Sequence, residues 1–123
     1  MPYLIQKNSE GAVVKQWDLH GGPLTVGRGD QVDAKIEDGE MSRQHFLVAQ
    51  EGNGYVIEDL KSHNGTWVNG RRVTKAALQP NDRIRAGVTQ FVFEEGLGTV
   101  IGQLEKERKG YSTLVREISK KPK

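Results

Sequence analysis

Groups that bind anions recur along the middle of this chain, on segments that the sequence predicts to be loops. Arg28 follows a glycine at the end of an apolar run. Ser42 and Arg43 precede another such run, and Asn64 stands in a turn-forming stretch. A guanidinium, a hydroxyl and an amide supply charge and hydrogen-bond donors that together suit a phosphate group. Because binding residues concentrate on loops held by a rigid scaffold, these side chains predict an anion-binding site.

Nucleophilic catalysis and metal binding are the alternative chemistries for these polar residues. Ser42, His45 and Asp59 could be imagined as a triad, but no nucleophile elbow accompanies the serine. His20, His45 and His63 lack the spacing of metal ligands. His45 opens an apolar run, where a histidine is more often a structural hydrogen-bond partner than a ligand. We therefore expect a protein that is not an enzyme and that needs neither a metal nor a cofactor.

Length, charge and cysteine content narrow the functional classes further. The chain has 123 residues, which is enough for one ordinary domain. Its net charge is +2, and residues 1–93 hold 11 basic and 11 acidic residues. A nucleic-acid-binding domain usually shows a basic excess, so we expect no nucleic-acid partner. With no cysteine, no signal-peptide pattern and no apolar run of membrane-spanning length, we expect a cytoplasmic protein without a membrane partner.

The elements that must position these groups are predicted to be short strands. Apolar or alternating runs are separated by turn residues throughout the first part of the chain, which is typical of a β-sandwich. We expect strands near residues 3–7, 12–19, 24–26, 34–37, 45–51, 55–60, 66–68, 71–73, 83–85 and 89–94. Phe91 and Phe93 alternate with a valine and should share one face. The facing of the 55–60 strand stays open, because both of its faces carry apolar residues.

Three turns have sequences that predict hairpins. Residues 8–11 and 52–54 each combine glycine with asparagine between two predicted strands. Asn69-Gly70 is the strongest of the three signals, because a type I′ turn needs positive φ at both of its central residues. The sequence therefore places the 66–68 and 71–73 strands side by side.

The pattern changes after residue 94, and we divide the chain into a domain of residues 1–94 and an extension of residues 95–123. Leu114, Val115 and Ile118 recur at helical spacing, which predicts a C-terminal helical segment. This segment could dock on the sandwich, act as a linker or contact another domain, including one in a second copy of the chain. Its lysine-rich end reads as a solvated tail.

The order and spacing of the loop motifs resemble those of the forkhead-associated (FHA) domain family over about residues 3–94. The motifs that carry the resemblance are Gly27-Arg28, Ser42-Arg43-Gln44-His45, Asn64-Gly65-Thr66 and Asn69-Gly70. Residues 78–87 also resemble the family's Leu-x-x-Gly-Asp-x-Ile turn, with Asn81 in place of the glycine. The resemblance implies an antiparallel β-sandwich of about eleven short strands, with a phosphothreonine-peptide site on the loops at one end.

The resemblance also assigns roles to individual residues. Arg28 and Ser42 would hold the phosphate, with Arg43 close by, and Asn64 would bond the ligand backbone. Supporting roles would fall to Gly27, His45, Gly65, Asn69 and Gly70. The implied partner is a phosphothreonine-containing protein of a Ser/Thr kinase pathway, so the chain would act as a signalling module.

One position departs from the family pattern. His63 stands before Asn64, where the family often has a serine or threonine that helps to bind the phosphate. Ser62 or His63 itself could supply that donor. The alternative is a degenerate FHA domain that binds a protein partner, or self-associates through residues 95–123, without recognising phosphate.

Overall fold

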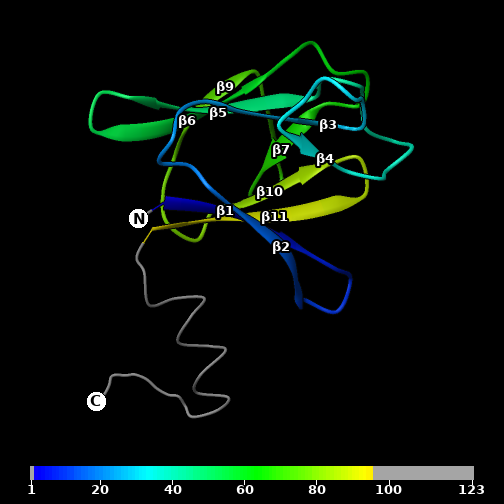
Figure 1. Cartoon of the computed structure of the whole chain (residues 1–123), viewed down its shortest axis with the longest axis horizontal. Helices are drawn as coiled ribbons and strands as arrows, with labels where there is room; N and C mark the ends of the chain where they lie inside the picture. The colour runs from blue at the N-terminus through cyan, green and yellow to red at the C-terminus, as the bar shows by residue number, and fades with distance from the viewer. Residues whose placement is uncertain (1, 96–123) are drawn as a thin grey trace. The chain divides into compact units, whose positions relative to one another are not determined.

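Short apolar runs separated by turn residues fold into eleven strands within residues 2–95, the part of the chain that the computed structural model describes (Figure 1). One sheet has six strands in the order β2-β1-β11-β10-β7-β8, and the other has five in the order β4-β3-β5-β6-β9. The bounds are β1 Pro2–Lys7, β2 Val13–Asp18, β3 Leu24–Gly27, β4 Ala34–Lys35, β5 Phe46–Glu51, β6 Gly54–Asp59, β7 Thr66–Val68, β8 Arg71–Val73, β9 Lys75–Leu78, β10 Arg83–Ala86 and β11 Thr89–Glu95. The predicted all-β sandwich of about eleven strands is confirmed.

Ten of these strands coincide with predicted runs to within a few residues, and one was not predicted. β9 (Lys75–Leu78) pairs antiparallel with β6. Two alanines in its centre favour helix over strand and give no alternation of polar and apolar residues. The strand forms because the edge of β6 offers unpaired backbone groups and because Leu78 is buried between the sheets. β4 is shorter than predicted, and it pairs parallel to β3.

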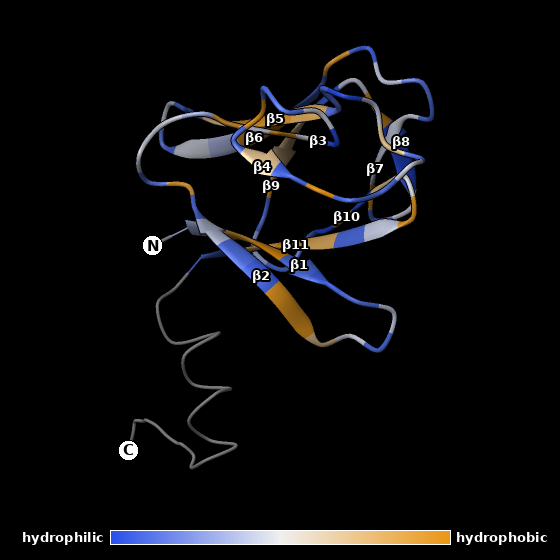
Figure 2. Cartoon of the chain, turned by 45° about the vertical axis from the view of Figure 1, so that its right-hand side comes forward, coloured by the Kyte–Doolittle hydropathy of each residue, from blue (hydrophilic) through white to orange (hydrophobic). Residues whose placement is uncertain are grey.

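The core lies between the two sheets and is centred on aromatic rings. Phe46 of one sheet meets Phe91 of the other edge to face, with ring centroids 5.4 Å apart. Phe91 and Phe93 share the inner face of β11, as predicted, and both are fully buried. Tyr55 and Ile57 are buried as well, which settles the facing of β6. Burying each such side chain contributes about 1.5–3 kcal/mol. Figure 2 shows the apolar colour on β5 and on part of β11.

The turn between β7 and β8 also holds β10 in place. Asn69 has φ +50° and Gly70 has φ +84°, the pair of positive values that a type I′ turn requires. The Asn69 side chain accepts a hydrogen bond from the Arg83 backbone N–H (2.9 Å) and donates one to the Asp82 carboxylate (3.0 Å). The turn therefore fixes the start of β10, which is central in the six-stranded sheet.

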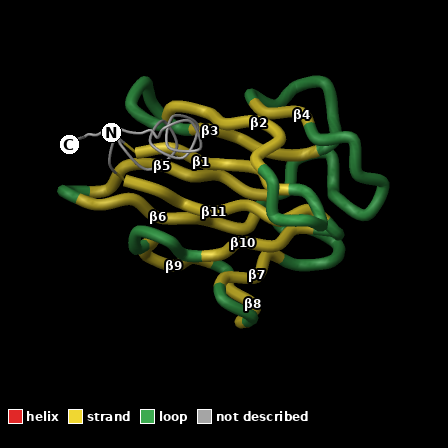
Figure 3. Tube along the Cα trace, turned by 90° about the horizontal axis from the view of Figure 1, so that it is seen from below, coloured by secondary structure: helices red, strands yellow, loops and turns green. Residues whose placement is uncertain are grey.

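Long loops gather beside β4 at one end of the sandwich (Figure 3). Residues 96–123 lie outside the described residues. They include the predicted C-terminal helix and most of the predicted extension, so the predicted self-association through this segment also lies outside. Within residues 2–95 no helix has the length and apolar character needed to cross a membrane.

Replacing Asn69 tests its structural role. Asn69→Ala removes both side-chain hydrogen bonds and places an alanine at positive φ, so we expect the free energy of unfolding in urea to fall by about 1–3 kcal/mol. Asn53→Ala is the matched control, because Asn53 is exposed in the β5–β6 turn and its side chain has no hydrogen-bond partner among the described residues. Equal stability of the two variants would contradict the role given to Asn69.

Candidate anion-binding site

Three loops meet at the site: residues 28–33 between β3 and β4, residues 36–45 between β4 and β5, and residues 60–65 between β6 and β7. The backbone N–H of Arg28 donates to the Ser42 carbonyl (3.0 Å). The backbone N–H of His63 donates to the Ser42 hydroxyl oxygen (2.9 Å). These bonds bring together the first two residues predicted to hold phosphate, and they place the 60–65 loop against the same serine.

Gly27 is required here by close approach, because its φ is not in the left-handed region. A Cβ at this position would lie 2.7 Å from the carbonyl carbon of Arg43 and would overlap its oxygen. The end of β3 can therefore pack directly against the Ser42–Arg43 peptide only if residue 27 has no side chain. This close contact positions the next residue, Arg28, at the site.

Arg28 is oriented by the chain and not by a carboxylate. Its Nε donates to the carbonyl oxygen of Met41 (2.7 Å). The two terminal nitrogens have no hydrogen-bond partner among the described residues, and the side chain is exposed. The guanidinium therefore keeps its full charge and two donor groups, which is the arrangement that binds phosphate oxygens in pairs.

Among the described residues, the Ser42 hydroxyl accepts one hydrogen bond, but its own hydrogen remains free to donate. Its oxygen accepts the His63 N–H, while its hydrogen donates to no group within residues 2–95. The half-buried side chain can donate that hydrogen to an anion beside Arg28. Arg43 is exposed next to it, and its guanidinium likewise makes no ion pair in the described part of the chain.

His45 is fully buried and connects the two loops that carry Ser42 and Asn64. Its Nδ1 accepts the backbone N–H of Ser42 (3.0 Å). Because an amide N–H can only donate, Nε2 carries the ring hydrogen and donates it to the carbonyl of Gly65 (2.8 Å). The Leu60 N–H donates to the His45 carbonyl (2.9 Å). The structure therefore places this residue as a hydrogen-bonded support.

Asp59 stabilises the 60–65 loop through its carboxylate. This carboxylate accepts hydrogen bonds from the hydroxyls of Ser62 and Thr66 and from the backbone N–H of Ser62. Burial raises the pKa of Asp59, but the hydrogen bonds from Ser62 and Thr66 lower it more, so the pKa lies below its usual range. The Ser62 hydroxyl is engaged with Asp59 and also accepts the Gly65 N–H (3.0 Å). Its predicted contact with a phosphate would require the bond to Asp59 to break.

Asn64 is positioned by the neighbouring loop. Its Nδ2 donates to the Glu40 carbonyl (2.8 Å) and lies 3.4 Å from the Glu40 carboxylate. Its Oδ1 has no partner within the described residues, so it remains an acceptor for a ligand N–H. The side chain of His63 is exposed beside it and makes no hydrogen bond within residues 2–95.

A surface hollow of about 750 Å³ opens beside Arg28 and Arg43. Lys35 and Asp30 also line it, and they pair with each other (2.6 Å). The other lining residues are Gly29, Gln31, Gln44 and Leu60. Because one of its three cations is paired with a carboxylate, the two arginines dominate the charge of this hollow.

The model of the FHA domain matches residues 24–87, which is more than half of this chain. The chain belongs to the FHA domain family. EmbR of Mycobacterium tuberculosis, a transcriptional regulatory protein, is 32% identical over 84 residues, or 68% of this chain and 22% of EmbR. The glycogen accumulation regulator GarA of Mycolicibacterium smegmatis is 33% identical over 72 residues, or 58% of this chain and 46% of GarA. The chain thus spans less than half the length of either relative.

Solved FHA domains share the fold of this one. Mycobacterium tuberculosis EmbR in complex with a low-affinity phosphopeptide matches with a TM-score of 0.70 at 29% identity, covering 80% of this chain and 25% of EmbR. The FHA domain of Mycobacterium tuberculosis FhaA, complexed with the intracellular domain of another protein, matches with a TM-score of 0.68 at 28% identity, covering 76% of this chain and 100% of that domain. The predicted family and fold class are confirmed.

Two carboxylates that support the site of this FHA domain were not predicted. Asp38 is buried and accepts hydrogen bonds from the Thr89 hydroxyl (2.6 Å), the Val88 N–H (2.9 Å) and the Glu40 N–H (2.8 Å). Burial raises its pKa, but the hydrogen bonds, led by that of Thr89, lower it below its usual range. The sequence suggests Asp59 only as a member of a triad with Ser42 and His45. Asp38 stands beside a glycine, and this pair predicts a turn. It does not predict the hydrogen bond that Asp38 accepts from Thr89, 51 residues further along the chain.

The residues predicted as support do not all lie at the loops. Gly27, His45 and Gly65 do, and His45 bonds the other loop to the carbonyl of Gly65. Asn69 and Gly70 instead lie at the opposite end of β7, where their turn holds β10. Their effect on the site is therefore through the sheet.

The lowered pKa of Asp59 gives a pH test. Because its folded pKa lies below the ordinary value, the stability that its carboxylate provides is fully present above that value and is lost as the pH falls through the folded pKa. Asp59→Asn should lower the free energy of unfolding by about 1–3 kcal/mol at pH 7. The gap from wild type should shrink below about pH 4. Urea unfolding across pH measures it, with exposed Glu58→Gln as control, and a pH-independent gap would contradict the assignment.

Proposed function

We propose that this FHA domain binds phosphothreonine segments of partner proteins at the loops that carry Arg28 and Ser42. One observation carries the proposal: the backbones of Arg28 and Ser42 are hydrogen-bonded to each other and backbone groups orient both side chains, yet the remaining donors of those side chains have no partner within residues 2–95. A phosphothreonine brings about −1.5 to −2 charges and three acceptor oxygens. The free donors would satisfy those oxygens without any loop having to unfold.

Neighbouring residues extend the recognition beyond the phosphate. Arg43 adds a second cation beside the first. The free Oδ1 of Asn64 would accept a backbone N–H of the ligand, and the exposed imidazole of His63 would take the place of the family's hydroxyl near the phosphate. Ser62 would contribute through the loop that it shapes with Asp59.

A binding module of this kind acts in Ser/Thr kinase pathways, where phosphorylation of the partner creates the ligand. An FHA domain is a binding module, and we propose no catalytic role. The phosphopeptide bound by EmbR, a relative of the same fold, supports this reading. The absence of cysteine suits the reducing cytoplasm. Self-association through residues 95–123 stays a prediction.

The test is calorimetry with a phosphothreonine peptide selected from an oriented library. We expect Arg28→Ala or Ser42→Ala to weaken binding by roughly 30-fold or more, since a hydrogen-bonded charge pair is worth about 2 kcal/mol or more. The unphosphorylated peptide should not bind. Both variants should remain folded, because each side chain is at least partly exposed.

Arg71→Ala is the matched control, since Arg71 is an exposed arginine on β8, away from the three loops. It should bind as wild type does. Unchanged affinity in Arg28→Ala, or a library without phosphothreonine hits, would contradict the proposal and would favour a domain that binds its partner without phosphate.

A further inference from the structure

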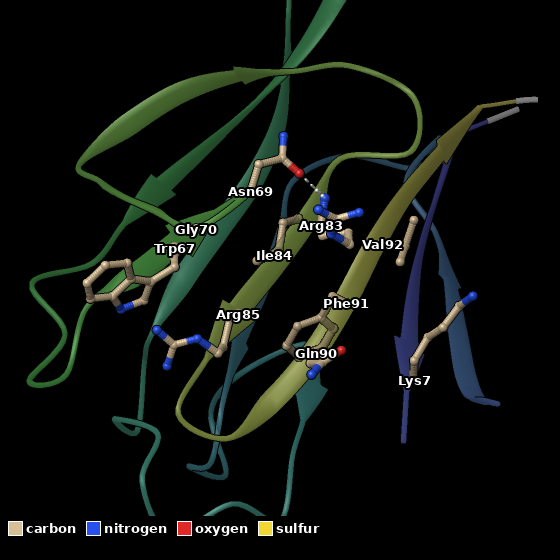
Figure 4. Close-up of a pocket in the computed structure, with 10 residues that line it drawn as sticks. All are labelled: Lys7, Trp67, Asn69, Gly70, Arg83, Ile84, Arg85, Gln90, Phe91 and Val92. Atoms are coloured by element: carbon tan, nitrogen blue, oxygen red, sulfur yellow. Dashed lines mark hydrogen bonds between the residues drawn. The ribbon is translucent and has the colours of Figure 1, made fainter. Parts of the chain in front are cut away.

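The outer face of the six-stranded sheet carries a row of cations around one tryptophan. Trp67 of β7 lies opposite Arg72 of β8 and Arg85 of β10, and Arg85 lies opposite Gln90 of β11. Side chains directly opposite each other on neighbouring strands share a face. The Arg85 guanidinium lies over the indole ring at 4.9 Å from its centroid. Figure 4 shows the tryptophan and Arg85 together at one side of this face.

A second set of residues completes the face. Arg83 lies opposite Val92, and Lys7 lines the same hollow of about 290 Å³ together with Trp67 and Arg85. We call Lys7, Trp67, Arg72, Arg83 and Arg85 the basic face. Trp67 and Val92 line the hollow with apolar side chains on this outer face, and no carboxylate is among its lining residues.

The cations of the basic face have no ion-pair partner within residues 2–95. In that part of the chain the salt bridges join Lys35 to Asp30 and Lys75 to Glu51, which lie elsewhere. Two acidic residues border the face. The Asp82 carboxylate accepts bonds from Asn69 and from the backbone of residue 79. Glu94 is buried, and burial raises its pKa although Lys7 opposes that shift. The positive charge of the face is therefore largely uncompensated.

The basic face is continuous with the loop that carries Asn64. The Trp67 Nε1–H donates to the Asn64 carbonyl (3.4 Å). Gly65 has φ +90°, and a Cβ there would lie 2.9 Å from Cζ of Arg72. The Arg72 guanidinium therefore lies directly against the loop, and a ligand that passes Asn64 meets it next.

We propose that the basic face binds an acidic segment of the same partner that carries the phosphothreonine, on the Asn64 side of the phosphate. This inference rests on the function proposed above. Unpaired cations on an otherwise neutral domain attract Asp and Glu side chains, and the tryptophan and the hollow accept the apolar parts of the segment. A nucleic acid fits less well, because residues 1–93 hold 11 basic and 11 acidic residues.

The experiment compares five phosphothreonine peptides by calorimetry. One is a neutral core, two carry a run of glutamates joined through a Gly-Ser spacer to one end or the other, and two carry the matching run of glutamines. One glutamate extension should tighten binding roughly three- to tenfold over its glutamine match, as a few exposed ion pairs would give. The gain should fall as salt is raised from about 50 to about 300 mM.

Variants show which residues produce the added affinity for the glutamate extension. The double variant Arg83→Gln/Arg85→Gln should lose most of this added affinity and should bind the core peptide as wild type does. Arg71→Gln, the matched control, should keep it, because Arg71 lies opposite inward-facing Val68 and so belongs to the other side of β8. In NMR spectra the Trp67 indole N–H, assigned with Trp17→Phe, should shift with the glutamate extension and not with the glutamine one.

The outcomes separate the two proposals. If no phosphopeptide binds, the proposed function fails and this inference fails with it. If the core binds but glutamates at neither end add affinity, or if the gain survives in the double variant, only the basic face is overturned. If a single-stranded oligonucleotide shifts the Trp67 indole N–H signal and the glutamate extensions add no affinity, the basic face would be assigned to nucleic acid instead.

Discussion

The site depends on the two hydrogen bonds made by the buried ring of His45. One fixes the backbone at Ser42 and the other fixes Gly65, residues on two different loops that follow β4 and β6 of the five-stranded sheet. Each bond satisfies a backbone group at the base of a loop, so removing the ring would leave both without their partner, at about 1–3 kcal/mol for each buried group. The loops can therefore be exposed at their tips and still hold a single geometry.

The distribution of charge follows from the same construction. The carboxylates of Asp38 and Asp59 are turned inward and accept hydrogen bonds from hydroxyls and backbone N–H groups. Arg28 is oriented by a carbonyl oxygen, which directs the guanidinium without neutralising it. Acidic groups thus shape the loops while basic groups keep their charge for a ligand. Beyond Asn64, the basic face likewise presents cations that have no ion-pair partner within residues 2–95.

Local chemistry was enough to predict most of the fold. Alternation and turn residues located ten strands and three hairpins, and Asn69-Gly70 even predicted its turn type. β9 was missed because its stability comes from pairing with β6 and not from its own alanines. The resemblance to the FHA family indicated which residues to expect on the loops, but not the hydrogen bonds that they make within the protein. The contact between Asp38 and Thr89 depends on how two sheets pack, which no short stretch of sequence contains.

A crystal structure of the domain with a phosphothreonine peptide from the oriented library tests the central claim most directly. We expect phosphate oxygens within hydrogen-bond distance of the Arg28 terminal nitrogens and the Ser42 hydroxyl. We also expect the bonds from His45 to Ser42 and Gly65 to stay as they are in the free protein. A phosphate bound away from Arg28 and Ser42, or loops that rearrange around a displaced His45, would contradict that claim.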